Sequence, residues 1–290
     1  MRKQTRYAKA KWAKVLGVSR SGYYTWLDEK DARESRQQMK VQKILNVYKE
    51  GEGHYGAERI CGIIRTRGGQ ASFRYVRSVM KQHGLRSSHC VRRQRSLTDS
   101  RGYRGADLIN LTHDLEIAQP FQVLTSDITY IRTREGFDYL CQVQDVHTNL
   151  ILATTQQSRM TQDIVHQTIQ KAKQRWSIAD GTIFHTDRGS QYTAKRTEKL
   201  IELLGLKLSY SRVGKPGDNA WSESFFANMK KEIIHGNYYQ TCDDARQATF
   251  EYIERYYNRK RVQKRLGYRC PYDYMMSFLD QQRNELKAVA

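Results

Sequence analysis

The sequence is short of acidic residues and has no long apolar run. It contains 30 Asp and Glu against 50 Lys and Arg, which gives its 290 residues a formal net charge of +20. No uninterrupted apolar stretch approaches the roughly 20 residues that cross a bilayer, and the basic N-terminus lacks the apolar core of a secretory signal. We therefore expect no membrane segment. The cation excess favours a polyanionic partner such as nucleic acid, bound in a salt-dependent way.

Cysteine pairs are absent as well. The five cysteines are scattered and odd in number, and no two form a Cys-x-x-Cys motif: they are Cys61, Cys90, Cys141, Cys242 and Cys270. This spacing indicates neither a disulfide framework nor a zinc knuckle. We expect a reduced, cytoplasmic protein.

Residues 1–33 have the outline of a helix-turn-helix segment. A short apolar helix is broken at Gly17, and Ser19 is able to cap a following helix. Arg20 opens that second helix, where such motifs touch DNA. The alternative is a small helical hairpin that binds nothing.

Residues 34–86 have apolar side chains at helical spacing and predict a helical, DNA-binding-like module. Its His54 is expected to be a hydrogen-bonded structural residue. Residues 87–117 carry many arginines without periodicity, which predicts a basic linker that touches phosphates. A linker that is only a solvated tether is the alternative.

Residues 118–278 show strand patterns followed by alternating helix and strand patterns. Strands are predicted at 122–132, 137–146, 150–155, 182–185 and 206–210, and helices at 162–176 and 195–204. The first three strands are separated by short turns and form an antiparallel meander. The pattern predicts an α/β catalytic core, a mixed sheet flanked by helices, with further C-terminal helices and a tail at 279–290.

Three carboxylates have positions that suit metal chemistry. Asp127 lies within the first predicted strand, Asp187 follows the short strand at 182–185, and Glu223 lies in the first turns of a helix. Hard cations such as Mg²⁺ prefer carboxylate oxygens. Two such ions can activate the attacking oxygen and stabilise the leaving oxygen in a displacement at phosphorus. In so basic a chain, the three acids predict an enzyme that cuts and joins DNA.

Other residues compete for this role, and spacing alone excludes neither Asp138 nor Asp145. Asp138 lies near a turn and is expected to be exposed, while Asp145 ends an apolar strand and is expected to be an accessory or structural acid. Asp218 or Asn219 is expected to cap the helix that carries Glu223, and for Asp218 this is a better explanation than a role in the metal site. His185 is expected to make structural hydrogen bonds.

The three acids lie in motifs of a known family. The motifs are Ser-Asp-Ile-Thr-Tyr at 126–130, His-Thr-Asp-Arg-Gly-Ser-Gln-Tyr at 185–192, Gly-Asp-Asn-Ala-Trp-Ser-Glu-Ser-Phe-Phe at 217–226 with Lys230 two helical turns after Glu223, and Tyr-Asn-Arg at 257–259 with Arg261 and Leu-Gly-Tyr at 266–268. With them the chain resembles the downstream-frame (OrfB-type) transposases of the insertion-sequence-three group. That group has a DDE core similar to retroviral integrases. The N-terminal half resembles the family too, at 16–24 and 55–60.

The resemblance implies an RNase H-like core in which Asp127, Asp187 and Glu223 are catalytic and bind two Mg²⁺ ions, for which Mn²⁺ can substitute. It implies a transposase that hydrolyses a phosphodiester at each element end and uses the freed 3′-OH for strand transfer, in DNA recombination and integration. The implied partners are double-stranded DNA of the transposon ends and target, further copies of the chain in a homo-oligomer, and the upstream-frame product or its fusion protein. Lys230 is implied to lie near the DNA. Gln263 departs from the pattern, because the family often has His there.

Basic residues and tyrosines are interleaved near the C-terminus. Arg259 and Arg261 belong to a stretch that is expected to track a DNA backbone. Its tyrosines, Tyr252, Tyr256 and Tyr257, are expected mainly to pack in the core.

Three other functions remain open from the sequence. A DNA-binding regulator of transposition without independent catalysis is the first, because the upstream helix-turn-helix and leucine zipper of the family do not appear. A nuclease for RNA–DNA hybrids fits the core but not the N-terminal modules. Glycoside hydrolysis by paired carboxylates leaves the net charge of +20 unexplained.

Overall fold

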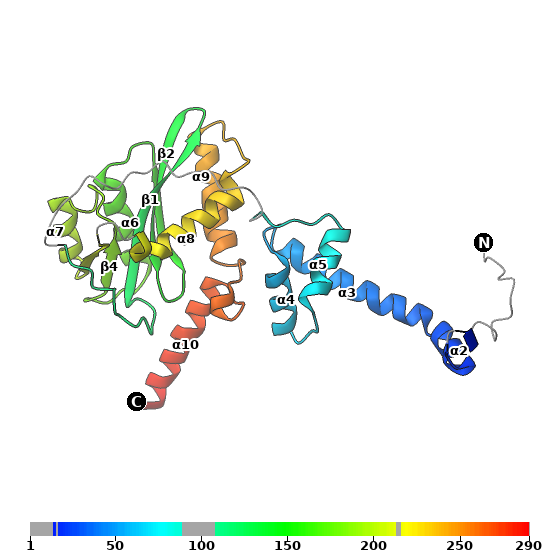
Figure 1. The fold of residues 1–290 in the computed structure, drawn as a ribbon. Helices are drawn as coiled ribbons and strands as arrows, with labels where there is room; N and C mark the ends of the chain where they lie inside the picture. The colour runs from blue at the N-terminus through cyan, green and yellow to red at the C-terminus, as the bar shows by residue number, and fades with distance from the viewer. Residues whose placement is uncertain (1–13, 16, 89–107, 213–215, 290) are drawn as a thin grey trace.

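The computed structural model describes residues 14–15, 17–88, 108–212 and 216–289. A helical module formed by the residues up to 88 lies beside an α/β core (Figure 1). Within the described residues, no helix has the length and apolar character needed to cross a membrane.

The helical module consists of α2 (Arg20–Asp28), α3 (Lys30–Glu50), α4 (Ala57–Thr66) and α5 (Phe73–Gln82). Ser19 caps α2 as expected, because its hydroxyl accepts a hydrogen bond from the Gly22 amide. The part of the helix-turn-helix outline that precedes residue 14 lies outside the described residues. Helices α3 to α5 pack around one apolar cluster, which includes Ile44, Val47, Ile60, Val76 and Val79.

A five-stranded mixed sheet forms the centre of the core. Its strands are β1 (Val123–Thr133), β2 (Gly136–Asp145), β3 (Ile151–Gln157), β4 (Ile183–Thr186) and β5 (Lys207–Tyr210). The order is β3-β2-β1-β4-β5, with β1, β2 and β3 antiparallel and with β4 and β5 parallel to β1. The predicted α/β class and antiparallel meander are confirmed.

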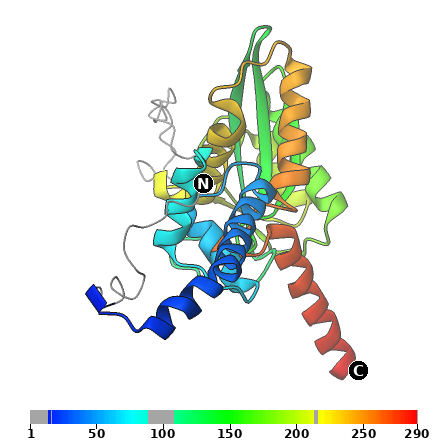
Figure 2. The same cartoon turned by 90° about the vertical axis from the view of Figure 1, so that its right-hand side faces the viewer.

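Helices cover both faces of the sheet (Figures 1 and 2). The remaining elements are α6 (Gln162–Arg175), α7 (Lys195–Leu203), η2 (Pro216–Asn219), α8 (Ala220–Met229), η3 (Lys230–Ile234), α9 (Cys242–Phe250), η4 (Glu251–Tyr257), η5 (Lys264–Leu266) and α10 (Pro271–Val289). One apolar cluster joins α6 and α7 to the sheet, and a second joins α8, α9 and η4 to it. β1 is therefore largely buried on both sides.

The helical module docks on the segment that follows η4. The Tyr55 hydroxyl donates to the Lys260 carbonyl at 3.0 Å and accepts from the Val262 amide at 3.1 Å. The Tyr256 hydroxyl donates to the Gly51 carbonyl at 3.0 Å. Because these polar groups are satisfied across the junction, the module and the core are held together by more than apolar contact.

The end of the predicted linker is part of the core. The Tyr210 amide donates to the Ile109 carbonyl at 3.0 Å, and the Leu111 amide donates to the Ser209 hydroxyl at 2.9 Å. Residues 108–112 thus run along β5. The arginines at 92–104 lie outside the described residues, so their contact with phosphates stays a prediction.

The division into domains also stays a prediction. α3 continues through the expected boundary between residues 33 and 34, and α10 continues through the one between residues 278 and 279. Segment 279–289 is therefore the second half of a helix whose first half contributes Met275 to the core.

Candidate active site

The parallel pairing of β1 with β4 brings two of the three acids together. Ser126 pairs with Thr186 at the last position of that ladder. The residues that follow this pair are Asp127 in β1 and Asp187 just after β4, and their side chains leave the same face of the sheet. The antiparallel partner of Asp127 on β2 is Gln142, which lies on this face too. The face is the one covered by α8 and α9.

The electrostatics of the two aspartates reflect this proximity. Burial and, after it, the charge of the neighbouring Asp187 carboxylate raise the pKa of Asp127, while the Ile128 amide that donates to Oδ1 at 2.7 Å opposes the rise; together these effects leave the pKa at about 8. Burial also raises the pKa of Asp187, against a hydrogen bond from the Gly189 amide at 2.9 Å. A cation bound between two such acids would stabilise their ionised forms.

Glu223 on α8 and Lys230 at the start of η3 also act on this site. Glu223 is exposed in the first turn of the helix, where partial burial raises its pKa. Its charge also raises the pKa of Asp127, whereas the charge of Lys230 lowers it. Among the described residues, no three His, Cys, Asp or Glu side chains lie close enough to share one ion in this arrangement. Asp127 and Asp187 follow paired positions of β1 and β4, and Glu223 lies on α8.

A buried polar network lies beneath these side chains and was not anticipated from the sequence. The Gln142 amide donates to Ser222 Oγ at 2.8 Å, and Ser222 Oγ lies 2.9 Å from Thr125 Oγ1. The Thr125 hydroxyl donates to Asn219 Oδ1 at 2.5 Å. Ser222 precedes Glu223, so the network joins the start of α8 to β1 and β2. No local sequence signal marks it, because its members come from three distant segments.

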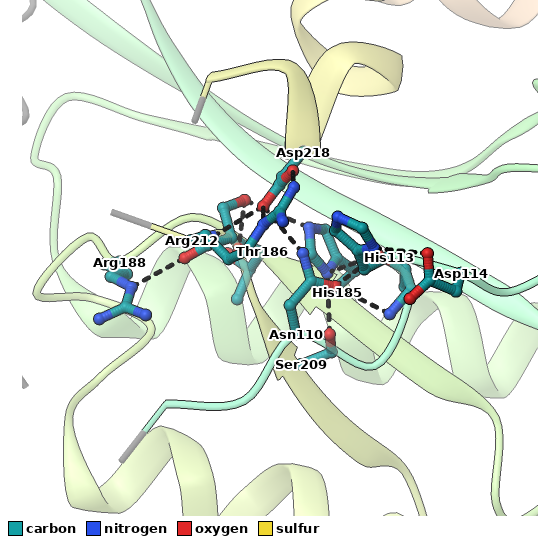
Figure 3. Close-up of polar contacts among 11 residues, drawn as sticks. Asn110, His113, Asp114, His185, Thr186, Arg188, Ser209, Arg212 and Asp218 are labelled. Atoms are coloured by element: carbon teal, nitrogen blue, oxygen red, sulfur yellow. Dashed lines mark hydrogen bonds and ion pairs between the residues drawn. The ribbon is translucent and has the colours of Figure 1, made fainter. Parts of the chain in front are cut away.

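A second polar cluster surrounds His185 near the end of β5 (Figure 3). The His185 ring is buried, with Nδ1 2.9 Å from Ser209 Oγ and Nε2 3.2 Å from Ser211 Oγ. Burial lowers the pKa of His185 to about 4, although Asp218 raises it. The expected structural role of His185 is confirmed. His54, which bonds Ser88 Oγ at 3.0 Å, is a structural histidine too.

Two predictions about the competing acids are wrong. Asp138 is fully buried, not exposed, because Arg246 on α9 binds both of its carboxylate oxygens at 2.9 Å. Asp218 does not cap α8; the other predicted residue, Asn219, holds the N-cap position, and the Asp218 carboxylate instead binds Arg212 and the Asn110 amide. Arg246 and Asn110 lie 108 positions from the acids that they bind, whereas Arg212 is only six positions from Asp218.

Asp145 has the structural role that was expected as one of its two readings. Its carboxylate accepts hydrogen bonds from the amides of Phe121 and Thr148 and from the Thr148 hydroxyl, each at 2.7 Å. Burial raises its pKa, and these hydrogen bonds oppose the rise. All of these bonds tie the end of β2 to its neighbouring turns.

The four cations predicted to contact DNA have different surroundings. Lys230 lies near Asp127, with Nζ 5.1 Å from the Tyr130 ring centroid. Arg259 is exposed over the Tyr272 ring. Arg20 begins α2, and its side chain lies outside what the structure describes. Arg261 is only 3% exposed and binds the Glu232 carboxylate, so the prediction that it contacts DNA is wrong.

The expected packing of the C-terminal tyrosines is confirmed. Tyr252, Tyr256 and Tyr257 are all buried, and Tyr257 stacks edge-on against Phe225 of α8 at 4.9 Å between ring centroids. These rings fill the space between α8 and η4. They are therefore not available to stack on DNA bases.

Comparison with known families gives matches over the whole core. Two models of the integrase core domain match residues 117–216 and 204–271. A transposase for the insertion sequence element IS904 of Lactococcus lactis is 34% identical over 249 residues, which cover 83% of this chain and 97% of that protein. The transposase InsF for insertion sequence IS3A of Escherichia coli is 32% identical over 252 residues, which cover 86% of this chain and 87% of that protein.

Solved structures with some similarity are also catalytic domains. The catalytic core domain of BIV integrase is 18% identical, with a TM-score of 0.41 over 57% of this chain and 98% of that one. The catalytic domain of Mos1 mariner transposase is 13% identical, with a TM-score of 0.41 over 47% of this chain and 71% of that one. On the identity and coverage of the sequence relatives, the chain belongs to the IS3-type insertion-sequence transposases, which have an integrase core and act in transposition and DNA integration.

Proposed function

We propose that Asp127, Asp187 and Glu223 form the metal-binding active centre of this transposase. The observation that supports this most is the pairing of β1 with β4, which makes Asp127 and Asp187 neighbours on one face of the sheet. Lys230 is the cation that acts on Asp127 there. Repulsion between two adjacent carboxylates costs stability, and chains retain such pairs mainly where function requires them.

The donor set fits a hard divalent cation. Integrase-core proteins generally use divalent metal ions, and carboxylate oxygens are the ligands that Mg²⁺ prefers. Asp127 and Asp187 would hold the metal, and Glu223 would complete the site by approaching from α8. Two Mg²⁺ ions, or Mn²⁺ in their place, would activate the attacking oxygen and stabilise the leaving oxygen at phosphorus. The five buried or scattered cysteines have no part in this proposal.

The residues of the chain then have distinct tasks in the reaction. Asp127 and Asp187 must be ionised, so a bound cation has to overcome the raised pKa of each. Lys230, two turns after Glu223, is placed to bind a phosphate of the DNA strand near the reacting bond. Water attacks the phosphodiester in the first step and the strand end leaves as a 3′-OH. In the second step that 3′-OH attacks a target phosphodiester, and a target 3′-OH leaves.

The helical module offers a basic surface for the DNA that flanks the cleaved bond. Arg33, Arg36 and Lys40 follow one face of α3 and line an open groove of about 710 Å³, closed on its other side by Ser72 and Tyr75 at the start of α5. Arg74 and Arg77 are exposed on α5 beside it. Within the described residues, no carboxylate forms an ion pair with Arg36, Lys40, Arg74 or Arg77. Unpaired cations on two helices support contact with a DNA backbone.

The experiment is cleavage and joining of labelled element-end DNA with Mg²⁺ or Mn²⁺. Wild-type protein is compared with Asp127→Asn, Asp187→Asn and Glu223→Gln, with and without the upstream-frame product. We expect each variant to bind end DNA yet lose at least about 10³-fold in cleavage, because each removes a ligand of the reacting centre. Asp163→Asn, which neutralises an exposed acid on α6, is the control and should cleave like wild type. Metal-dependent nicking that survives in Glu223→Gln would contradict the proposed centre.

A regulator of transposition that binds DNA without cutting it is the second candidate. One observation favours this regulator: among the described residues, the three acids do not lie close enough together to share one ion. Strand transfer by the chain alone would exclude this candidate. DNA binding without cleavage in every combination of protein and metal would support it.

A further inference from the structure

We propose that Thr125, Gln142, Asn219 and Ser222 are positioning residues that hold the first turn of α8, and with it Glu223, at a fixed distance from Asp127. We call these four residues the α8 clamp. The inference rests on the proposed function, because it assigns the clamp to the same metal centre. It goes beyond that function by assigning a task to four side chains that do not themselves carry charge.

The hydrogen atoms of the clamp can be assigned without ambiguity. The Thr125 hydroxyl donates to Asn219 Oδ1 at 2.5 Å, so its proton is used there. The contact of 2.9 Å between Thr125 and Ser222 must then be a donation from the Ser222 hydroxyl. Ser222 Oγ in turn accepts from Gln142 Nε2 at 2.8 Å. The result is a directed chain from Gln142 through Ser222 and Thr125 to Asn219.

The members of the clamp stand next to the proposed ligands in the sequence or in the sheet. Gln142 is the register partner of Asp127 on β2, and Thr125 lies two residues before Asp127 on the same face of β1. Ser222 precedes Glu223 directly. A movement of α8 along or away from β1 would therefore break the bonds of Ser222 and Asn219 together.

The clamp has features that stability of the fold alone does not explain. All four side chains are at most 4% exposed, and Gln142 Oε1 is buried with no hydrogen-bond partner among the described residues. A buried polar atom without a partner costs about 1–3 kcal/mol in other proteins, and apolar residues would fill the same space at less cost. A polar clamp in this place is better explained by the need for a directional link.

Asn219 supplies an independent indication. It holds the N-cap position of α8, where an Asn side chain usually accepts a hydrogen bond from the amides of the first turn. Here it makes no such bond, and its oxygen accepts from Thr125 instead. The helix thus gives up its side-chain cap, and the same oxygen ties the helix to β1.

The test uses the full chain and compares two substitutions of Thr125. Thr125→Val removes the hydroxyl but keeps the volume, and Thr125→Ser keeps the hydroxyl. Ser222→Ala breaks the clamp at a second place. Thr249→Val is the matched control, because Thr249 is also buried and its hydroxyl donates to Gln156 on β3, outside the proposed centre. Circular dichroism and binding of end DNA establish that each variant is folded.

The main readout is binding of Mn²⁺ without DNA, measured by electron paramagnetic resonance and by the rise in Tm that Mn²⁺ produces. We expect Thr125→Val and Ser222→Ala to need about tenfold more Mn²⁺ than wild type, as is typical when the support of a metal ligand is lost. Thr125→Ser and Thr249→Val should stay within about threefold of wild type. The Mn²⁺ concentration for half-maximal cleavage should shift in parallel.

Two different failures can be told apart. If wild type binds Mn²⁺ and loses this binding in Glu223→Gln, while Thr125→Val and Ser222→Ala bind like wild type, the clamp proposal is overturned and the proposed function stands. The clamp is overturned as well if Thr249→Val weakens Mn²⁺ binding as much as Thr125→Val does. If wild type neither binds Mn²⁺ nor cleaves, the proposed function is wrong and the clamp is wrong with it.

Discussion

Lys230 and Asp127 of the proposed centre affect each other's pKa. Lys230 begins η3 directly after α8, its Nζ lies over the Tyr130 ring, and burial lowers its pKa while Asp127 raises it. The charge of Lys230 in turn lowers the pKa of Asp127, which other groups raise to about 8. The two side chains therefore control one another's ionisation.

We expect Lys230→Ala to reduce cleavage about tenfold or more, because the DNA loses a phosphate contact and Asp127 loses a compensating charge. The pKa of Asp127 should rise further, so the pH at which the rate of cleavage is half-maximal should move upward. Rates measured between pH 6 and pH 9 test this. Lys231→Ala, one residue further on, is the control; an equal loss in that variant would show that the effect is not specific to Lys230.

Individual residues were predicted well where the signal is local and poorly where the partner is distant. Asp127 could be placed within a strand and Asp187 just after one, since strand patterns are read from neighbouring residues. Asp138 and Arg261 look like surface groups in the sequence. Their burial depends on Arg246 and Glu232, which no local spacing connects to them.

At the scale of elements, η3 and η4 are joined by a buried ion pair. Glu232 of η3 binds Arg261, which follows η4, at 2.8 Å, and it accepts a hydrogen bond from the Tyr252 hydroxyl at 2.7 Å. Both η3 and η4 are π-helices, a rare form in which one residue is added to a turn. Strands and α-helices can be predicted from the periodicity of apolar residues. The two π-helices cannot, because the contacts between η3, η4 and Arg261 involve residues that are distant in the sequence.

The ion pair gives a prediction for stability. Burial would raise the pKa of Glu232, but the charge and hydrogen bonds of Arg261 outweigh it, so that the pKa lies below its ordinary value of 4.5. The stabilisation is therefore fully present above about pH 4.5 and is lost as the pH falls through the lowered pKa. Arg261→Met leaves Glu232 buried without its partner and should cost about 3–5 kcal/mol at pH 7.

Urea unfolding at pH 7 and at pH 4 measures both effects. The double variant Glu232→Leu with Arg261→Met should be close to wild type at pH 7, because it removes both charges. It should also lose less stability than wild type on acidification. A double variant as unstable as Arg261→Met would contradict the assignment of the cost to an unpaired buried charge.

The whole molecule depends on the junction between the helical module and the core. Gly62 of α4 faces the Tyr268 ring, and a Cβ at Gly62 would overlap that ring. We expect Gly62→Val to weaken docking by about 1–3 kcal/mol, the usual cost of overpacking. Small-angle X-ray scattering should then give a larger radius of gyration than for wild type.

The matched variants make the cause of this change clear. Gly56→Ala adds a methyl group that meets its nearest neighbour, Ser87, at 3.9 Å, and it should leave the radius unchanged. Combining Gly62→Val with Tyr268→Ala creates space for the larger side chain and should recover part of the docking. If the double variant is as expanded as Gly62→Val, the contact with Tyr268 does not hold the junction.

The basic surface of the module gives a prediction about DNA affinity. Arg74→Ala and Arg77→Ala should each reduce the slope of log K against log salt by about 1, because each removes one phosphate contact. Lys199→Ala, on α7 at the opposite end of the molecule (Figure 1), should leave the slope unchanged. Fluorescence anisotropy with end DNA at several salt concentrations tests this. Unchanged slopes in both arginine variants would place the DNA elsewhere.

Backbone groups on the two outer strands of the sheet, β3 and β5, form hydrogen bonds with other parts of the chain. Along β3, the Asn258 amide group bonds both the N–H and the C=O of Ile151 at 3.0 Å, as a neighbouring strand would, and Trp176 bonds the Leu152 carbonyl. Along β5, the Tyr210 amide donates to the Ile109 carbonyl, and the Ser209 hydroxyl accepts from the Leu111 amide. Open strand edges invite pairing with other chains. Where these bonds are made, the outer strands have fewer free backbone groups with which another copy of the chain could extend the sheet.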